Sequence, residues 1–199
     1  MKQIAILIPT LPVRIEKYCK LIKEINRQVI EHDLCDKIQI VTFGDTKDYV
    51  VGHKRNVLLG MSLAKYICFI DDDDFISPKY VIQLYNASLK DVDCVSFNGV
   101  FVSQGTERLI DMSKSHRGDI DENNCYYRLP NHLSCVKREI ALKCKFPLLQ
   151  FGEDNEYSKR IKKYIKTEHK IKDILYFYNY DKRTSQTNPN GSSNQFKEY

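Results

Sequence analysis

Short apolar segments alternate with amphipathic ones over the first half of the chain. Residues 3–9, 38–43 and 66–70 are apolar-rich runs, a pattern that predicts buried strands. After the first run, apolar side chains recur at steps of three and four, which predicts a helix through Ile15, Tyr18, Ile22, Ile25 and Val29. A second helix is predicted over residues 54–64. Strand, helix, strand, helix, strand implies right-handed crossovers and a parallel sheet.

The second half of the chain is richer in β-forming residues. A helix over residues 78–89 begins it, with Ser77 as its cap and Pro78 in its first turn. The elements expected next are, in order, strands at 94–97 and 100–102, a hairpin near Gly105 into 108–110, a mobile polar loop at 113–124, a β-like stretch at 126–136, helices at 137–143 and 155–165, and a strand at 171–180.

The chain of 199 residues contains no repeat and no linker, so we expect one domain over residues 1–181. Residues 182–199 are rich in Ser, Asn and Thr and are expected to form a flexible tail. No apolar run approaches the roughly 20 residues that cross a bilayer, although the basic run 159–172 leaves peripheral membrane contact open.

Cysteine usage and net charge restrict the compartment and the ligands. The seven cysteines are scattered and include no C-x-x-C pair, which predicts reduced thiols in a cytoplasmic protein and argues against a zinc site. A formal net charge of +5 is mild; it favours anionic ligands and does not exclude nucleic acid.

Four consecutive aspartates, residues 71–74, directly follow the third predicted strand; we call them the Asp run. Like charges this close repel, so at least one should take up a proton unless a cation sits among them. In an extended chain Asp71 and Asp73 would share one face, and Asp72 and Asp74 the other. Two carboxylates on one face suit Mg²⁺ or Mn²⁺, whose other ligands are typically waters and phosphate oxygens. The simpler interpretation, a solvated acidic turn that caps the next helix, ranks second.

Other polar residues are expected at the same edge of the sheet. Thr10, Asp45 and the Asp run all follow predicted parallel strands, and ligands of such sheets bind at the carboxyl ends of the strands. Glu153 and Asp154 come at the start of a predicted helix, whose positive end stabilises a carboxylate. The simpler interpretation of that pair is N-capping by Asp.

Four short segments, in chain order, resemble motifs of GT-A fold glycosyltransferases of the family 2 type, and the resemblance covers roughly residues 3–180. They are the nucleotide-contacting first loop at 8–14 (Ile-Pro-Thr-Leu-Pro-x-Arg), the G-x-x-R-N segment at 52–56, the D-x-D-D metal motif at 69–74 and the E-D motif at 152–154. Residues 136–139 with Phe146 and Pro147 are similar to the family's R-R-E … F stretch. Each motif alone is weak, but all of them in order make a strong signal.

The resemblance implies a fold and a reaction. The fold would be α/β, a GT-A (Rossmann-like) single domain with a mostly parallel central sheet flanked by helices. The reaction would be metal-dependent, inverting transfer of a sugar from a nucleotide-diphosphate donor to a hydroxyl of a glycan, a lipid-linked intermediate, a protein or a modified nucleic acid.

The resemblance also implies roles for individual residues. Asp73, helped by Asp71, would hold Mn²⁺ or Mg²⁺ at the diphosphate, where the ion acts as a Lewis acid. Asp154 would be the general base, and Glu153 would orient the loop or bind acceptor hydroxyls. The donor nucleotide would contact Thr10, Leu11, Arg14, Asp45, Arg55, Asn56, Asp71 and Asp72.

The sequence leaves alternatives open at the end of the second strand, at His132 and in the tail. The second strand ends in Phe43-Gly44-Asp45-Thr46 where the family usually has Asp-Asp-Gly-Ser, so base recognition would shift to Asp45 or to the Phe43 ring. His132 is expected to be a satisfied core histidine, with acceptor contact as the second interpretation. Arg183, with Lys182 and the tail, could fold over the diphosphate as a lid.

Functions of other classes fit the motifs less well. A D-x-D-type phosphotransferase would have Thr or Val two residues past its second Asp, where this chain has Phe75, and would have the motif on its first strand. An EF-hand loop lacks its Gly here. A non-catalytic nucleotide-sugar binding protein would account for the Asp run but would leave the pair Glu153 and Asp154 without a function.

Overall fold

Three parallel strands form the first part of the sheet. In the computed structural model, which describes residues 1–103 and 105–179, β1 (Lys2–Thr10) lies between β2 (Ile38–Gly44) and β3 (Ala64–Phe69), and pairs in parallel with both. The single turn η1 (Pro12–Arg14) and helix α1 (Ile15–Glu31) connect β1 to β2, and α2 (Val51–Met61) connects β2 to β3. The carboxyl ends of these strands therefore meet at one edge, as predicted.

The second part of the sheet is mixed. Strand β9 (Cys135–Lys137) runs antiparallel to both β3 and β5 (Cys94–Ser103). The remaining strands are β4 (Phe75–Ile76), β6 (Thr106–Met112), β7 (Ile120–Glu122), β8 (Cys125–Arg128) and β10 (Glu168–Asn179). The sheet runs in the order β2-β1-β3-β9-β5-β6-β8-β7, and β10 pairs in parallel with β5 and antiparallel with β4. The result is a single α/β domain with a mostly parallel, mixed central sheet, which confirms the predicted fold class.

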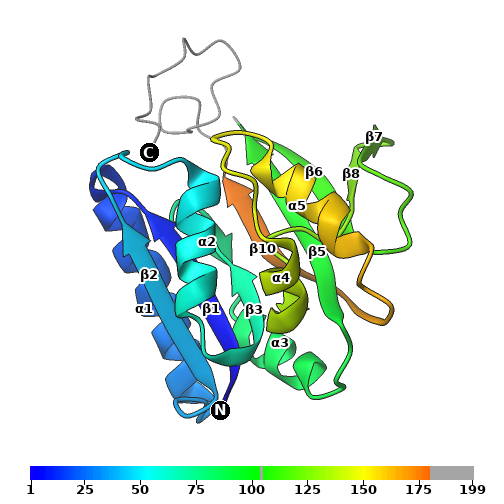
Figure 1. Ribbon diagram of the computed structural model, residues 1–199. Helices are drawn as coiled ribbons and strands as arrows, with labels where there is room; N and C mark the ends of the chain where they lie inside the picture. Colours follow the sequence, from blue (N-terminus) through cyan, green and yellow to red (C-terminus); the bar gives the residue numbers. More distant parts are fainter. Residues whose placement is uncertain (104, 180–199) are drawn as a thin grey trace.

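Helices cover both faces of the sheet (Figure 1). Helices α2, α4 (Arg138–Cys144) and α5 (Glu153–Lys162) lie on one face, and α1 and α3 (Tyr80–Ser88) lie on the other. Alternate residues of β1 enter two separate cores: Ile4, Ile6 and Ile8 pack on the α1 and α3 side, whereas Ala5 and Leu7 pack on the opposite side. A strand buried on both faces has no polar side, which is why residues 3–9 form an apolar run.

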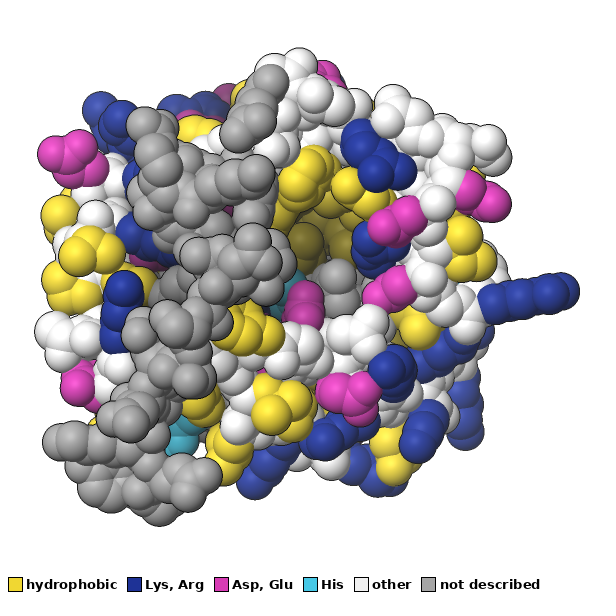
Figure 2. Space-filling view, turned by 90° about the horizontal axis from the view of Figure 1, so that it is seen from above, with side chains coloured by type: hydrophobic (Ala, Val, Ile, Leu, Met, Phe, Trp, Pro, Cys, Tyr) yellow, Lys and Arg dark blue, Asp and Glu magenta, His cyan; other side chains and the backbone are white. Residues whose placement is uncertain are grey.

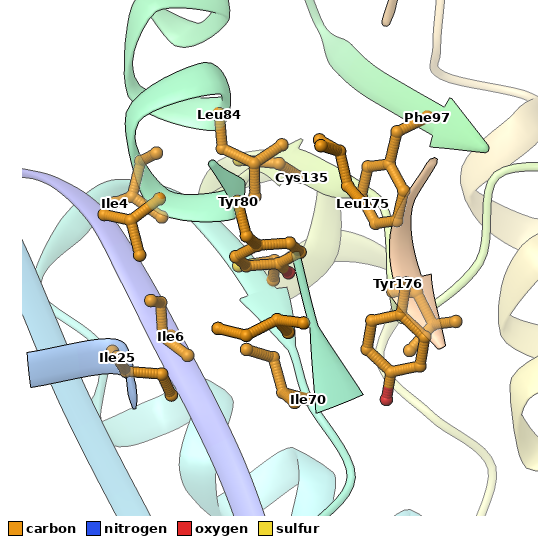
Figure 3. Packing of buried hydrophobic residues seen from close by; sticks show 14 of the residues in the cluster. Ile4, Ile6, Ile25, Ile70, Tyr80, Leu84, Phe97, Cys135, Leu175 and Tyr176 are labelled. Atoms are coloured by element: carbon orange, nitrogen blue, oxygen red, sulfur yellow. The ribbon is translucent and has the colours of Figure 1, made fainter. Parts of the chain in front are cut away.

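Figure 3 shows the core on the α3 side. The ring of Tyr80 from α3 lies among Ile4 and Ile6 of β1 and Ile70, while Tyr176 of β10 lies at the edge of the same cluster. The hydroxyl of Tyr176 points away from these apolar side chains. Its ring therefore packs in the core, while its hydroxyl can contact the Asp run at the end of the sheet.

Several predicted bounds differ from those of the structure. Helix α2 begins at Val51, three residues before the predicted start, because the N–H of Gly52 donates to the carbonyl oxygen of Leu149 at 3.1 Å and the neighbouring loop fixes the first turn. Helix α5 begins at Glu153 and not at residue 155. The two predicted strands at 94–97 and 100–102 are one strand, β5, because β6 and β10 both pair with it across residues 98–102.

The stretch from residue 113 to residue 136 was the least well predicted part of the described chain. Its polar part, expected to be loop throughout, contains β7, which pairs with β8. The expected continuous β-stretch divides into β8 and β9, because the N–H of Ser134 donates to the carbonyl oxygen of Asn131 and closes a turn between them. The predicted tail and its boundary after residue 181 lie outside the described residues.

The basic run 159–172 is not simply a solvated face. The ammonium of Lys170 donates to the carbonyl oxygen of Met112 at 2.6 Å and to the carboxylate of Asp111 at 2.9 Å, so this side chain joins β10 to the end of β6. Lys162 donates to the carbonyl oxygen of His116. In the described part of the chain, no helix combines the length and the apolar character that crossing a bilayer requires.

Candidate active site

The Asp run forms a turn at the end of β3. The N–H of Asp74 donates to the carbonyl oxygen of Asp71 at 3.2 Å, so the chain turns instead of continuing extended. The predicted alternation, with Asp71 and Asp73 on one face, is therefore wrong. A solvated turn is not present either, because Asp72 and Asp74 are 1% and 4% exposed. Each carboxylate has its own set of neighbours.

Asp72 holds the loop that follows β1. Its carboxylate accepts hydrogen bonds from the hydroxyl of Thr10 at 2.7 Å, from the N–H of Leu11 at 3.2 Å and from Nη1 of Arg14 at 2.8 Å. These four residues were predicted to contact the donor nucleotide, and the structure brings them together at the wall of one cavity of about 160 Å³, which we call the first cavity. The carboxylate of Asp72 has three donors from this loop, so it fixes the position of the other three residues.

Asp73 and Asp71 also line the first cavity, and their pKa values shift in opposite directions. The carboxylate of Asp73 lies 3.0 Å from Nη1 of Arg14. Burial raises the pKa of Asp73 to about 6, Arg14 opposes the shift, and the charges of Asp71 and Asp72 add to it. Burial would also raise the pKa of Asp71, but Arg55, 3.1 Å away, and His132 outweigh it and hold that pKa below its ordinary value.

Asp74 faces away from these cations, toward the last strand. It accepts a hydrogen bond from the hydroxyl of Tyr176 at 2.6 Å and another from the N–H of Asn179 at 2.8 Å. Burial, together with the charges of Asp71 and Asp73, raises the pKa of Asp74 well above its ordinary value. The Asp run thus joins the end of β3 to the end of β10, and repulsion among its carboxylates adds to burial in raising the pKa values of Asp73 and Asp74.

Arg55 connects the Asp run to the start of α5. Besides its contact with Asp71, its Nε lies 3.3 Å from a carboxylate oxygen of Glu153. The buried guanidinium packs over the rings of Phe69 and Phe146, whose centroids lie 5.3 and 5.7 Å from its central carbon. A buried cation needs such partners, so Arg55 places the two acidic motifs on one cavity.

The two acidic residues at the start of α5 differ in access. Gly152 precedes them with a φ of 76°, a left-handed conformation that favours glycine. The side chain of Glu153 is 7% exposed, and burial raises its pKa although Arg55 opposes the shift. The side chain of Asp154 is 41% exposed. Asp154 is therefore the member of the pair that a ligand can reach.

His132 lies between the two acidic motifs. Its Nε2 is 3.5 Å from a carboxylate oxygen of Asp71, and its Nδ1 is 3.8 Å from one of Asp154. The residue is 6% exposed, and neither ring nitrogen has a hydrogen-bond partner within the described residues. The expected burial of His132 is confirmed, and its two ring nitrogens face the carboxylates of Asp71 and Asp154. The signal in the sequence was its place beside Pro130 and Asn131, where a β-like stretch must break.

Asp45 and Asn56, two predicted donor contacts, do not line either cavity. Asp45 pairs with the ammonium of Lys54 at 2.8 Å and accepts a hydrogen bond from the N–H of Tyr49. The side-chain amide of Asn56 exchanges two hydrogen bonds with the backbone of Phe146, at 2.9 and 2.8 Å. Both side chains hold α2 against its neighbouring loops.

Some lining residues were missed, and one predicted residue is not described. Lys54, Gln150, Tyr178 and Asn179 line the first cavity, although the sequence offered no motif that singled them out. Arg183, the proposed lid residue, lies outside the described residues. Within residues 1–103 and 105–179, no group of three or more His, Cys, Asp or Glu side chains could by itself enclose a metal ion.

A second cavity, of about 360 Å³, adjoins the first and shares with it His132, Asp154 and Tyr178. Figure 2, which views the molecule from the end toward which these strands point, shows a hollow with hydrophobic side chains in its depth and acidic and histidine side chains beside it. The reachable carboxylate of Asp154 therefore lies where two cavities meet.

Comparison with known proteins extends this description. No family model matches the chain, and no curated protein sequence matches it. Solved structures do: S. aureus TarS 1–349 aligns with a TM-score of 0.64 and 14% identity over 89% of this chain and 60% of that one. The fold is shared with glycosyltransferases. The catalytic domain of Drosophila β1,4-galactosyltransferase 7, in complex with xylobiose, aligns with a TM-score of 0.60 and 12% identity over 98% of this chain and 77% of that one.

TarS 1–349 has also been solved with UDP-GlcNAc, and that structure aligns with a TM-score of 0.64 and 12% identity over 90% of this chain and 59% of that one. The chain thus spans about three fifths of these TarS structures. At such identities the likeness establishes the fold, and the function must be argued from the site.

Proposed function

We propose that this chain is a glycosyltransferase of the GT-A fold and family 2 type, which moves a sugar from a nucleotide-diphosphate donor to an acceptor hydroxyl. One observation carries the proposal: Arg55 pairs with both Asp71 and Glu153, so that the Asp run and the pair Glu153 and Asp154 face one cavity. The shared fold supports it, because TarS has been solved with UDP-GlcNAc and with UDP.

The charge of the first cavity favours a divalent cation. Among its described lining residues there are six carboxylates and three cationic side chains, those of Arg14, Lys54 and Arg55. Even with a proton on Asp74, a diphosphate would enter a negative environment, which is unfavourable without a further cation. Carboxylate oxygens suit Mg²⁺ or Mn²⁺, and such ions need few protein ligands when phosphate and water supply the others. We therefore assign Asp73, with Asp71, as the residues that would hold it.

The remaining residues of the first cavity follow from their contacts. The metal ion, when bound, would supply Lewis-acid neutralisation of the departing diphosphate. Arg14, in the loop that Asp72 fixes, and Lys54 of α2 are cations of this lining, and they would bind phosphate oxygens. Glu153 is buried in an ion pair with Arg55 and would position the start of α5.

Asp154 is our candidate for the general base. It is reachable, and it lies on the border of both cavities, where an acceptor hydroxyl could approach from the second cavity toward a donor in the first. Removal of the hydroxyl proton during attack from the side opposite the leaving group would invert the anomeric centre.

The state of the cysteines agrees with a reducing compartment such as the cytoplasm. All seven are free thiols, and five of them are buried. Disulfides form and persist in oxidising compartments, so a chain with seven free cysteines fits the cytoplasm better than an extracellular location.

The first experiment compares Asp73→Asn and Asp154→Asn with the wild-type chain. A panel of nucleotide-diphosphate sugars, with and without Mn²⁺, is screened by thermal shift, because a ligand that binds the native state raises the unfolding temperature. The rate of nucleoside diphosphate release is then measured with the donor that binds. We expect Asp73→Asn to lose the Mn²⁺-dependent shift. We expect Asp154→Asn to keep that shift and to lose about 10²- to 10⁴-fold in rate.

Glu156→Gln is the matched control for Asp154→Asn. Glu156 lies in the same first turn of α5, but it pairs with Lys159 and lines neither cavity. It should keep both donor binding and rate. A panel in which no nucleotide-sugar changes the unfolding temperature, or a near-normal rate for Asp154→Asn, would contradict the proposal.

A further inference from the structure

The second cavity has the size and the lining of a ligand site. Its volume of about 360 Å³ falls within the range of small-molecule pockets, roughly 300–1,000 Å³. Three aromatic residues from three strands line it: Phe101 of β5, Tyr126 of β8 and Tyr178 of β10. Helix α5 adds Asn155 and Ser158 to the lining. Apolar walls with a few convergent polar groups are typical of such sites.

Two buried polar side chains at this cavity lack partners within the described residues. The hydroxyl of Ser158, a residue that is 3% exposed, makes no hydrogen bond there, and neither ring nitrogen of His132 makes one. Buried polar groups in native proteins are normally hydrogen-bonded, so each exception needs an explanation. Both residues line the second cavity, where a ligand with hydroxyl groups would satisfy them.

The aromatic side chains are held in fixed positions. The rings of Phe101 and Tyr178 stack with centroids 5.5 Å apart and planes 21° apart, and the ring of Tyr126 meets Phe101 edge-on at 5.5 Å. The guanidinium groups of Arg108 and Arg128 lie 3.9 and 4.8 Å from the centroid of Tyr126. Aromatic rings held in fixed positions, in a lining that also has hydroxyl and imidazole groups, suit a sugar ring, which has C–H faces and a hydroxyl-bearing edge.

The charge of the second cavity's described lining disfavours anionic ligands. Its described lining includes the carboxylates of Asp119, Asp121 and Asp154 and one guanidinium, that of Arg128. Nη1 of Arg128 lies 2.5 Å from a carboxylate oxygen of Asp121, so its charge is already neutralised. A phosphate group here would be repelled by the remaining carboxylates. The cavity therefore suits a neutral ligand.

We propose that the second cavity binds the acceptor as a neutral sugar unit, with the hydroxyl that receives the transferred sugar beside Asp154. This inference rests on the proposed glycosyltransferase function and adds the class of acceptor. Of the acceptors that the sequence left open, a carbohydrate fits the aromatic wall, the unpartnered Ser158 hydroxyl and the negative charge together. A nucleic acid would bring phosphates to a negative rim.

The test uses a pair of hydroxyl deletions on α5. Ser158→Ala removes the unpartnered hydroxyl at the second cavity. Tyr157→Phe removes the neighbouring buried hydroxyl, which also lacks a partner within the described residues, but packs against Phe146 and lines neither cavity. Neither change breaks a hydrogen bond within the described chain, so both variants should fold with unfolding temperatures no lower than that of the wild type.

The probes are the methyl pyranosides of glucose, galactose, mannose, xylose and N-acetylglucosamine, with glucose 6-phosphate and a mononucleotide as charged counterparts. Binding to the full chain is measured by saturation-transfer NMR and titration without donor. We expect at least one neutral pyranoside to bind, the charged probes to bind more weakly, and Ser158→Ala to reduce affinity about fivefold, the loss of one hydrogen bond. Tyr157→Phe should bind as the wild type does.

The outcomes separate this inference from the proposed function. Donor binding is read by thermal shift without pyranoside, and pyranoside binding is read without donor, so either can fail alone. Failure of every neutral pyranoside to bind would overturn the acceptor assignment. So would tighter binding of a phosphorylated probe, or an equal loss of affinity in Ser158→Ala and Tyr157→Phe.

Discussion

At the scale of single residues, the four aspartates of the Asp run show how neighbouring carboxylates are accommodated in different ways. Asp72 has three hydrogen-bond donors from the loop after β1. Asp71 has the guanidinium of Arg55. Asp73 and Asp74, with raised pKa values, are those whose charge is least compensated. Asp74 accepts hydrogen bonds from Tyr176 and Asn179, whereas Asp73 lies beside Arg14 and has no such donors of its own in the described residues. Asp73 is therefore the carboxyl best placed to exchange its proton for a metal ion.

The raised pKa of Asp73 predicts how Mn²⁺ binding depends on pH. With a pKa of about 6, this carboxyl in the metal-free protein is ionised at neutral pH and protonated in mild acid. Below about pH 6 the metal ion must displace the proton, so the apparent affinity should fall about tenfold for each pH unit. An ordinary carboxyl would delay that fall to about pH 4. Titration of Mn²⁺ followed by electron paramagnetic resonance, from about pH 5 to about pH 7, measures it.

Asp73→Asn is the control for this titration. The variant cannot bind a proton at the position, so its weaker Mn²⁺ affinity should change little between about pH 5 and pH 6, where Asp71 stays ionised because of Arg55. The same slope in Asp73→Asn as in the wild type would assign the titration to another group and remove Asp73 from the metal site.

At the scale of elements, the start of α2 and the loop before α5 are packed at a distance that allows no side chain between them. A Cβ placed on Gly52 would lie 1.9 Å from the carbonyl oxygen of Pro147. In the same loop, the carbonyl oxygen of Leu149 accepts a hydrogen bond from the N–H of Gly52, and the backbone of Phe146 exchanges two hydrogen bonds with the side chain of Asn56. The G-x-x-R-N segment therefore sets the distance between the Asp run and the acidic pair of α5.

Gly52→Ala should accordingly push the loop away. Overpacking of this kind costs about 1–3 kcal/mol, more than the gain of up to about 1 kcal/mol in helix propensity. Gly60→Ala is the matched control, because Gly60 lies in the same helix with no atom within 4 Å of its added Cβ, and it should stabilise the chain by up to about 1 kcal/mol. Urea unfolding measures both. A Gly52→Ala variant as stable as Gly60→Ala would show that the loop yields without cost.

The elements that the sequence predicted well are those whose burial leaves a local pattern. Strands β1 and β3 are buried on both faces, and α1 buries Leu21, Ile25 and Val29 at helical spacing, so the apolar pattern identifies them without knowledge of their partners. Strand β7 leaves no such pattern: residues 120–122 are all exposed, and they form a strand because β8 pairs with them. The structure of β7 depends on a partner that its own segment does not specify.

The site divides in the same way. The motifs located the Asp run, Arg55 and the acidic pair, because their residue types and order are characteristic. They did not show that Asn56 would bond to the backbone of Phe146, or that His132 would lie between Asp71 and Asp154. These contacts depend on how loops that are distant in the sequence pack together, and no local sequence pattern specifies that packing.

At the scale of the whole molecule, Asp74 fastens the last strand to the middle of the sheet. It is separated by about a hundred positions from Tyr176 and Asn179, and both donate hydrogen bonds to it. Tyr178, between them, lines both cavities. The position of this wall therefore depends on a buried carboxyl whose pKa is raised well above its ordinary value.

That raised pKa predicts a decrease of stability with pH. The folded chain holds the proton of Asp74 more tightly than the unfolded chain, so the free energy of unfolding falls as pH rises from the unfolded pKa, about 4, through the folded one. The slope contributed by one group is at most about 1.4 kcal/mol per pH unit. Asp74→Asn carries no proton to lose, so its stability should decline less over the same range. The amide does not titrate, so any change that it makes in the hydrogen bonds from Tyr176 and Asn179 is the same at every pH, and the slope is the informative quantity. Urea unfolding of both proteins in EDTA, from about pH 4 upward, gives the two slopes. Parallel slopes would mean that Asp74 is ionised in the folded chain and that its two donors suffice to hold β10.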